Sequence, residues 1–259
     1  MWILEMRAHR ALIPREHGAT TQLVLVIASA AAVSSASASL LLLAAAATAL
    51  FVAHEPLMVS LGKLGARRRE ARGRDAAIFL PALAGIALVA GVLGLGASPT
   101  RATLLALLPC VALATAALGS ALRGPERTLG VELLAALAMA WLAAPLALAG
   151  GAPASLALSL ALLWSGVFAL GTLAARSILI SKRDGGRGVR WARAASLLAV
   201  AGCSAALVVD ISPAWVPAAL LPTALMVMLL TLLAPRPAQM TRTGLLLATA
   251  AAAALPALP

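Results

Sequence analysis

Charged and aromatic side chains are scarce in this sequence. Only 11% of the 259 residues are charged, nine of them are acidic, and tyrosine is absent. Soluble domains carry about twice this charged fraction, and disordered chains hold far fewer apolar residues than the 62% found here. The composition therefore excludes a disordered protein and argues strongly against a water-soluble globule. It leaves lipid as the solvent for most of the chain.

Cysteine and the common catalytic motifs are also scarce or absent. The two cysteines, Cys110 and Cys203, each lie within a long apolar run, with no second ligand at the spacing of a metal site. We interpret both as packing residues. No Walker loop, GxSxG, CxxC or Rossmann glycine pattern occurs. The usual sequence patterns of nucleotide binding, serine hydrolysis and dithiol redox chemistry are therefore missing.

Long apolar runs separated by Arg, Gly and Pro make up most of the chain. About 20 residues are needed to cross the roughly 30 Å hydrocarbon core of a bilayer. Residues 19–53 are apolar throughout, but one helix of that length would reach about 50 Å, so we expect a re-entrant turn near Ser35, in the SSASAS segment. The expected spans are then nine: 19–35, 38–61, 76–96, 101–121, 127–149, 153–181, 191–210, 213–234 and 242–258.

The cations divide unequally between the two sides that nine spans define. Nineteen of the 20 Lys and Arg residues fall on one side, and Arg101 alone falls on the other. Cytoplasmic loops are enriched in Lys and Arg. We therefore expect an all-α fold, a polytopic membrane helix bundle of nine transmembrane helices, with the N-terminus cytoplasmic and the C-terminus outside. No repeat or polar segment interrupts the pattern, so residues 1–259 are expected to form a single transmembrane domain.

The net charge of +11 indicates a lipid partner rather than a nucleic acid. The cations are spread over five short loops at the membrane edge, with no aromatic side chains between them, so anionic lipid headgroups are the expected partners. Arg outnumbers Lys eighteen to two, and Ala and Leu dominate, as in proteins of GC-rich bacteria. The expected location is the cytoplasmic (inner) membrane of a bacterium.

Ionisable residues inside the expected spans are few and, apart from Arg101 and Asp210 at the outer edge, lie toward the cytoplasmic side. In lipid each costs roughly 2.5 to 3.5 kcal/mol, so each calls for a physical reason. Residues 14–18, with the sequence PREHG, enter the first span, and His54-Glu55-Pro56 lies about two turns from the end of the second. Pro56 predicts a kink there. Arg127 and Glu132 begin the fifth span, and Arg176 lies near the end of the sixth.

A compact bundle would bring these residues together as a polar pocket that faces the cytoplasm and opens into lipid. Such a pocket suits an amphipathic anion. The expected binding residues are Arg15, Glu16, His17, Arg127 and Arg176, with the arginines on the anionic head. The expected catalytic residues are His54, Glu55 and Glu132, which could move a proton or bind a metal.

Each of these residues also has an ordinary structural interpretation. Arg15 and Arg127 can extend to lipid phosphates, and Glu16 can cap the first helix. Arg176 can pair with either Glu55 or Glu132 and simply join two helices. These alternatives stay open at the level of the sequence.

Two stretches of sequence resemble a known family. PREHGA at the mouth of the first span is followed by HEPLMVSLG and a basic RRRE loop at the end of the second. This arrangement resembles the YwiC-like family of bacterial integral membrane proteins, and the resemblance covers most of the chain. It implies a multi-pass membrane protein but no particular reaction.

A more distant resemblance is to the UbiA superfamily of membrane prenyltransferases. Those enzymes are bundles of nine helices with a cytoplasmic N-terminus, and their main cytoplasmic loops follow helices 2 and 6. Here the longest basic loops, 62–75 and 181–190, follow the second and sixth expected spans. The resemblance implies isoprenoid chemistry with Mg²⁺ as cofactor.

The sequence departs from that superfamily in its acidic residues. UbiA enzymes hold Mg²⁺ and a prenyl diphosphate with two Asp-rich motifs. This chain offers only Glu55, Glu70 and Asp75 near the first loop and Asp184 near the second. Mg²⁺ bound to a diphosphate needs several oxygen ligands. These four acidic residues do not form the two Asp-rich motifs that supply them in UbiA enzymes.

The sequence thus favours a UbiA-like membrane protein that binds an isoprenoid, a quinone or a similar amphipathic anion. It would act either as a prenyltransferase-like enzyme without Asp-rich motifs or as a relative that only binds. A proton-coupled transporter is an alternative, because intramembrane glutamates and a proline within a helix suit such carriers. An accessory or assembly subunit of a respiratory complex is another. The cofactor, apart from the implied Mg²⁺, and the protein partners stay unknown.

Overall fold

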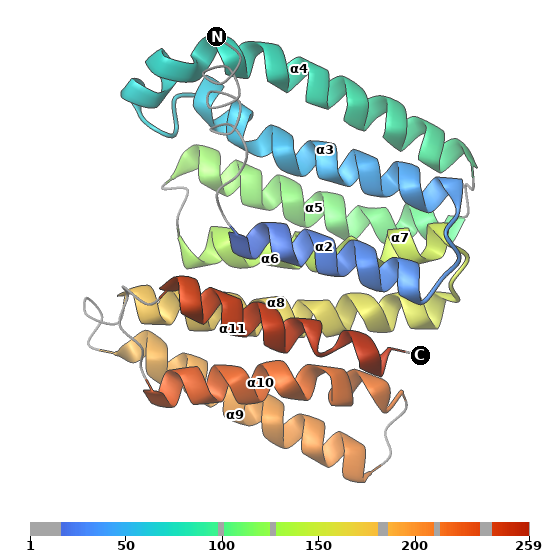
Figure 1. Cartoon of the computed structure of the whole chain (residues 1–259), viewed down its shortest axis with the longest axis vertical. Coiled ribbons are helices and arrows are strands. Elements are labelled where there is room, and N and C mark those ends of the chain that lie inside the picture. The colour runs from blue at the N-terminus through green and yellow to red at the C-terminus, as the bar shows by residue number, and fades with distance from the viewer. Residues whose placement is uncertain are drawn as a thin grey trace.

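The computed structural model describes residues 17–97, 101–124, 128–180, 186–209, 213–233 and 240–258, and in these ranges the chain is helical without strands (Figure 1). The helices are α2 (His17–Ala32), α3 (Ala38–Ser60), α4 (Ala66–Ala97), α5 (Arg101–Arg123), α6 (Leu129–Trp141), α7 (Ala143–Ala149), α8 (Ala154–Ile180), α9 (Arg187–Val208), α10 (Trp215–Leu233), α11 (Met240–Ala252) and the 3-10 helix η2 (Leu255–Ala257).

Each of the nine expected spans corresponds to a helix, with α6 and α7 together forming the fifth. By length and composition, seven of these segments can cross a membrane. The helices α2 and α11, of 16 and 13 residues, are shorter than a full span. The described residues therefore show a polytopic membrane protein with seven candidate spans, and helix length alone does not establish nine.

Proline accounts for the end of α6 but does not interrupt α3. Pro145 has no N–H to donate to the carbonyl of Trp141, four residues earlier, and α6 ends at Trp141. In α3, by contrast, Pro56 lies inside a helix that continues to Ser60. The kink expected at Pro56 stays a prediction.

The basic residues gather at one end of the bundle. Figure 1 shows that α3, α5, α8 and α10 finish at the end where α4, α6, α9 and α11 begin. We call it the basic end, because among the described cations only Arg101 belongs to the opposite end. The predicted division of the cations is confirmed for the described part of the chain.

The serine-rich segment between α2 and α3 is a turn, as predicted, and it is fixed to a distant loop. Ser35 donates from both its N–H (3.0 Å) and its Oγ (2.7 Å) to the carbonyl of Gly150. The Oγ of Ser37 donates to the carbonyl of Ala149 at 2.7 Å and also caps α3 by accepting the N–H of Leu40. We call these contacts of residues 34–37 with Ala149 and Gly150 the serine seam. The seam joins the first helix pair to the end of α7.

The main core lies where α2, α6, α7 and α8 meet. Trp164 of α8 is fully buried there, and its Nε1 donates to the Oγ of Ser29 on α2 at 2.8 Å. Ser29 in turn donates to the carbonyl of Val26 at 3.0 Å. Nearly all of α7 is buried against the same cluster.

The pair α3–α4 is packed more separately. α4 packs on α3 and makes only slight contact with the other described helices. Ser39 of α3 donates its Oγ to the carbonyl of Gly94 at 2.6 Å, and a Cβ at Gly94 would lie 3.0 Å from the Leu43 side chain. Only the first turns of α3, through Leu40, Leu43 and Ala44, belong to the main core. The outward side chains of α4 and α5 are largely exposed and apolar, as lipid-facing helices require.

Candidate functional site

The structure describes part of the predicted site. Arg15, Glu16 and Arg127 lie outside the described residues, and of His17 only the backbone, which opens α2, is described. The remaining four predicted site residues are placed on three helices. His54 and Glu55 lie in the last turns of α3, Glu132 lies in the first turn of α6, and Arg176 lies in the last turns of α8. All four are therefore toward the basic end (Figure 1).

Glu132 is positioned by the start of α6. Thr128 caps this helix, because its Oγ1 accepts the N–H of Val131 at 3.3 Å. The N–H of Glu132 donates to the carbonyl of Thr128 at 3.0 Å, which places the carboxylate in the first helical turn. A negative side chain there is favoured by the positive end of the helix dipole. The local sequence thus explains why a glutamate is tolerated at this depth.

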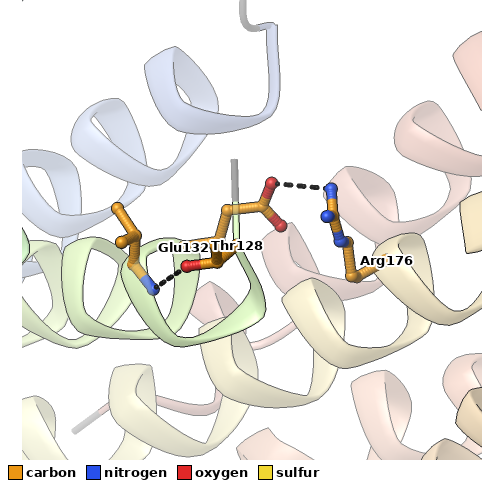
Figure 2. A network of polar contacts seen from close by, with 4 residues as sticks. Thr128, Glu132 and Arg176 are labelled. Atoms are coloured by element: carbon orange, nitrogen blue, oxygen red, sulfur yellow. Dashed lines mark hydrogen bonds and ion pairs between the residues drawn. The ribbon is translucent and has the colours of Figure 1, made fainter. Parts of the chain in front are cut away.

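Arg176 reaches Glu132 from the neighbouring helix α8. Figure 2 shows the two side chains extended toward each other, with Nη1 of Arg176 3.2 Å from Oε1 of Glu132. The Arg176 side chain is 22% exposed and the Glu132 side chain 33% exposed. The sequence left open which glutamate Arg176 would contact, and the structure shows Glu132. Pairing reduces the cost of holding both charges near lipid.

Glu55 pairs with a residue that the sequence analysis did not select. Its Oε1 lies 3.5 Å from Nη1 of Arg68, with side-chain exposures of 22% and 50%. Arg68 belongs to the first turn of α4. Gly62 and Gly65, both with positive φ, allow the tight turn between the helices. Glu55 lies five residues before the end of α3 and Arg68 two residues after the start of α4. A short turn followed at once by arginines is the signal in the sequence that could have indicated a partner for Glu55 among residues 67–69.

The α3–α4 turn also contacts α5. Nζ of Lys63 donates to the carbonyl of Leu122 at 2.5 Å. This carbonyl lies in the last turn of α5, where backbone oxygens lack partners within the helix. Lys63, expected only as a membrane-edge cation, thus connects the α3–α4 pair to α5 at the basic end.

Among the described residues, no group of three or more His, Cys, Asp or Glu side chains is placed to hold a metal ion. Glu55 and Glu132 are instead engaged by arginines. The described residues therefore do not fit the Mg²⁺ that the UbiA resemblance implies, and they give no basis for a reaction step at a metal ion. Asp184 and Glu16 fall outside the described ranges.

The two ion pairs stand on different pairs of helices, Glu55–Arg68 on α3 and α4 and Glu132–Arg176 on α6 and α8. His54 is exposed on α3, next to the first pair. The convergence of all the predicted residues on one pocket stays a prediction. The geometry does show two places at the basic end where a guanidinium and a carboxylate meet and could bind or exchange an anion.

Comparison with known families matches residues 13–147 to the family described as YwiC-like protein. The matched part contains His54, Glu55 and Glu132 and ends within α7, so Arg176 lies beyond it. Searches of curated proteins and of solved structures found no match. The likeness to membrane prenyltransferases therefore stays a prediction.

Proposed function

The chain belongs to the YwiC-like family, and from its apolar helical bundle we propose that it is a bacterial inner-membrane protein that binds an amphipathic anion at its basic end. The ligand class is an isoprenoid, a quinone or a similar lipid-soluble molecule with an anionic head. Membrane lipids are its other partners, and nucleic acid is not one of them. The basic end faces the cytoplasm in this proposal, because cytoplasmic loops carry most Lys and Arg residues.

The proposal includes nine membrane crossings. The short helix α2 supports this count, because its residues Leu25, Val26 and Ala30 belong to the main core together with α7 and α8. α11 contributes Ala251 to the same cluster. Short helices inside a bundle are accommodated by local thinning of the bilayer at modest cost.

The Glu132–Arg176 pair is the observation that carries the proposal. Arg176 could reach water at the basic end, as arginines near helix ends commonly do. Its guanidinium instead lies against α6, 3.2 Å from the Glu132 carboxylate. An arginine directed toward a neighbouring helix, at the end of an otherwise apolar bundle, can contact an anionic head while the ligand's chain remains among apolar helices.

The other predicted residues have defined parts in this proposal. Arg15 and Arg127 hold the head together with Arg176, supported by Glu16 and His17. His54 and Glu55 are the groups available for proton transfer beside the bound head. The proposal concerns binding, because the described residues lack a metal-ligand group on which prenyl transfer could rest.

Mass spectrometry of the purified protein tests the proposal. We expect solvent extraction of the wild type to release a lipid-soluble molecule with an anionic head, and Arg176→Gln to release much less of it. Arg187→Gln is the matched control, because Arg187 is exposed at the start of α9 and is not one of the predicted site residues. Equal recovery from all three proteins, or no ligand from any, would contradict the proposal.

A further inference from the structure

The helices α3 and α4 are joined to each other near both ends of the pair. Ser39 of α3 donates to the carbonyl of Gly94, and a Cβ at Gly94 would lie only 3.0 Å from the Leu43 side chain. At the basic end, Val59 of α3 and Ala76 of α4 are buried in a small apolar cluster whose members all belong to the pair and its turn. The two helices are therefore built to move as one body.

The described contacts of this pair with the main core lie at the end opposite the basic end. The core includes Leu40, Leu43 and Ala44 of α3, and Leu95 of α4 packs against it. The serine seam precedes α3 at the same end. Beyond Ala44, no described residue of α3 belongs to the main core, although the helix continues for about 24 Å to Ser60. The pair is thus a lever that is attached at one end.

A hydrogen bond joins the basic end of the pair to α5. Nζ of Lys63, in the α3–α4 turn, donates to the carbonyl of Leu122 at 2.5 Å, and both residues are exposed. The carbonyl lies in the last turn of α5, where the helix dipole also favours a cation. Water can replace either partner of such an exposed bond, so its net contribution is small. The contact can therefore open and close.

We propose that the α3–α4 pair is a hinged gate. It pivots as one body about its contacts at the end opposite the basic end, and Lys63 is the latch that holds it to α5. Opening separates α3 from α5 at the basic end and admits a hydrocarbon chain between them from the surrounding lipid. The use of the gate for ligand entry rests on the proposed function, whereas the movement itself does not.

Distances between spin labels test the gate in the full-length protein, reconstituted in lipid nanodiscs with both native cysteines replaced by alanine. Labels at Ile78 of α4 and Ala116 of α5, both exposed, report on the latched end. In Lys63→Met we expect a second, longer distance whose population is about five-fold larger than in the wild type, the effect of losing one hydrogen bond. Lys63→Arg keeps a cation that can reach the same carbonyl and should retain the wild-type distances.

Two further label pairs show whether the movement is a pivot. Leu93 of α4 and Leu105 of α5 are exposed near the attached end, so their distance should change much less than that at the latched end. Leu41 and Ile78 both belong to the hinged pair, and their distance should stay constant in Lys63→Met. A change between Leu41 and Ile78 would mean that the pair unfolds and would contradict the proposal.

Arg67→Met is the matched control, because it removes another exposed cation, at the start of α4, and leaves Lys63 in place. It should give the wild-type distances, and a similar opening in this variant would contradict a latch at Lys63. Since Lys63 is exposed in a turn, its replacement should not prevent folding, and Lys63→Gln offers a second uncharged variant.

Failure of the gate can be told apart from failure of the proposed function. A Lys63→Met protein with the wild-type distances would overturn the gate alone, since the measurement needs no ligand. A purified protein that releases no lipid-soluble ligand would overturn the proposed function and leave the hinged movement standing.

Discussion

Trp164 and Ser29 form a buried polar contact at the centre of the bundle. Both side chains are fully buried, and the indole N–H has the Ser29 hydroxyl as its acceptor at 2.8 Å. A buried donor that loses its acceptor keeps the full cost of its desolvation. In a membrane protein, where apolar burial does not distinguish helix contacts from lipid contacts, such a bond helps to define which helices meet.

We predict that Ser29→Ala lowers the free energy of unfolding by about 1–3 kcal/mol, because it leaves the indole N–H of Trp164 unpaired. Trp164→Phe removes the donor, so Ser29→Ala should cost less in that background. Equilibrium unfolding in mixed micelles measures both effects.

Ser165→Ala is the control for this cycle. The Ser165 hydroxyl donates to the carbonyl of Ala161 within α8 itself. Its removal should change stability by no more than about 0.5 kcal/mol. If Ser29→Ala costs no more than this control, the interhelical bond does not stabilise the bundle.

At the scale of single residues, the sequence predicted positions better than partners. Depth within apolar runs identified Glu132 and Arg176, and the structure pairs them. The Ser29–Trp164 contact joins residues 135 positions apart, and neither belongs to a motif. Arg68 was hidden among adjacent arginines, because charge alone does not say which of them turns back toward α3. Such pairings depend on helix register and packing, which hydropathy does not contain.

The serine seam fixes the position of one helix pair relative to another. Three hydrogen bonds from Ser35 and Ser37 reach two carbonyls at the end of α7. Gly150 permits this approach, because a Cβ there would lie 2.1 Å from Oγ of Ser34, 2.7 Å from its Cβ and 2.9 Å from a Leu40 methyl. The turn that prevents α2 and α3 from forming one long helix is therefore also a tertiary contact.

We predict that Gly150→Ala destabilises the protein by about 1–3 kcal/mol, the usual cost of overpacking a tight contact. The added methyl group would force the turn away from α7 and break the bonds of the seam. Thermal unfolding in detergent measures the loss. Gly119→Ala is the matched control, since no atom lies within 4 Å of its added Cβ.

The control should be neutral or stabilising, by up to about 1 kcal/mol, because alanine favours a helix more than glycine does. A Gly150→Ala variant as stable as this control would show that the seam can open without cost.

At the scale of elements, the sequence located the helices because apolar length is a strong signal in membrane proteins. It placed the break near Ser35 correctly from length alone. It missed the division of the fifth span, although Pro145 four residues after Trp141 marks the break. It could not show that the serine turn docks on Gly150, since the two segments are 115 positions apart.

The cations predict the orientation of the whole molecule. The described Lys and Arg residues other than Arg101 belong to the basic end, and from the positive-inside rule we expect that end to face the cytoplasm. Whether the described chain crosses the membrane seven or nine times depends on α2 and α11, because these two helices are shorter than a full span.

Single cysteines at the ends of α2 and α11 test the number of crossings, in a background with both native cysteines replaced by alanine. The chosen positions are exposed: Gly18, Ala36, Arg242 and Pro256. With a membrane-impermeant maleimide on intact cells, we expect labelling at Ala36→Cys and Pro256→Cys. Gly18→Cys and Arg242→Cys should react only after permeabilisation. Labelling of Gly18→Cys from outside would mean that α2 does not cross the membrane.

For the molecule as a whole, the expected order of spans predicted correctly that the described cations other than Arg101 belong to one end of the bundle. Whether the polar residues of different helices meet in one pocket could not be predicted from charge or hydropathy. Glu55 and Glu132 lie on different helix pairs, α3–α4 and α6–α8, and the hydropathy of each helix does not determine the order of the helices across a bundle.

The close approach of α3 and α4 at Gly94 has a consequence for how the protein is made. Nearly all the contacts of α4 are with α3, the helix translated just before it. The two can therefore leave the translocation channel as a finished hairpin before the remainder has been synthesised. In the folded bundle, α6, α7 and α8 pack on α2, and α7 also packs on α3.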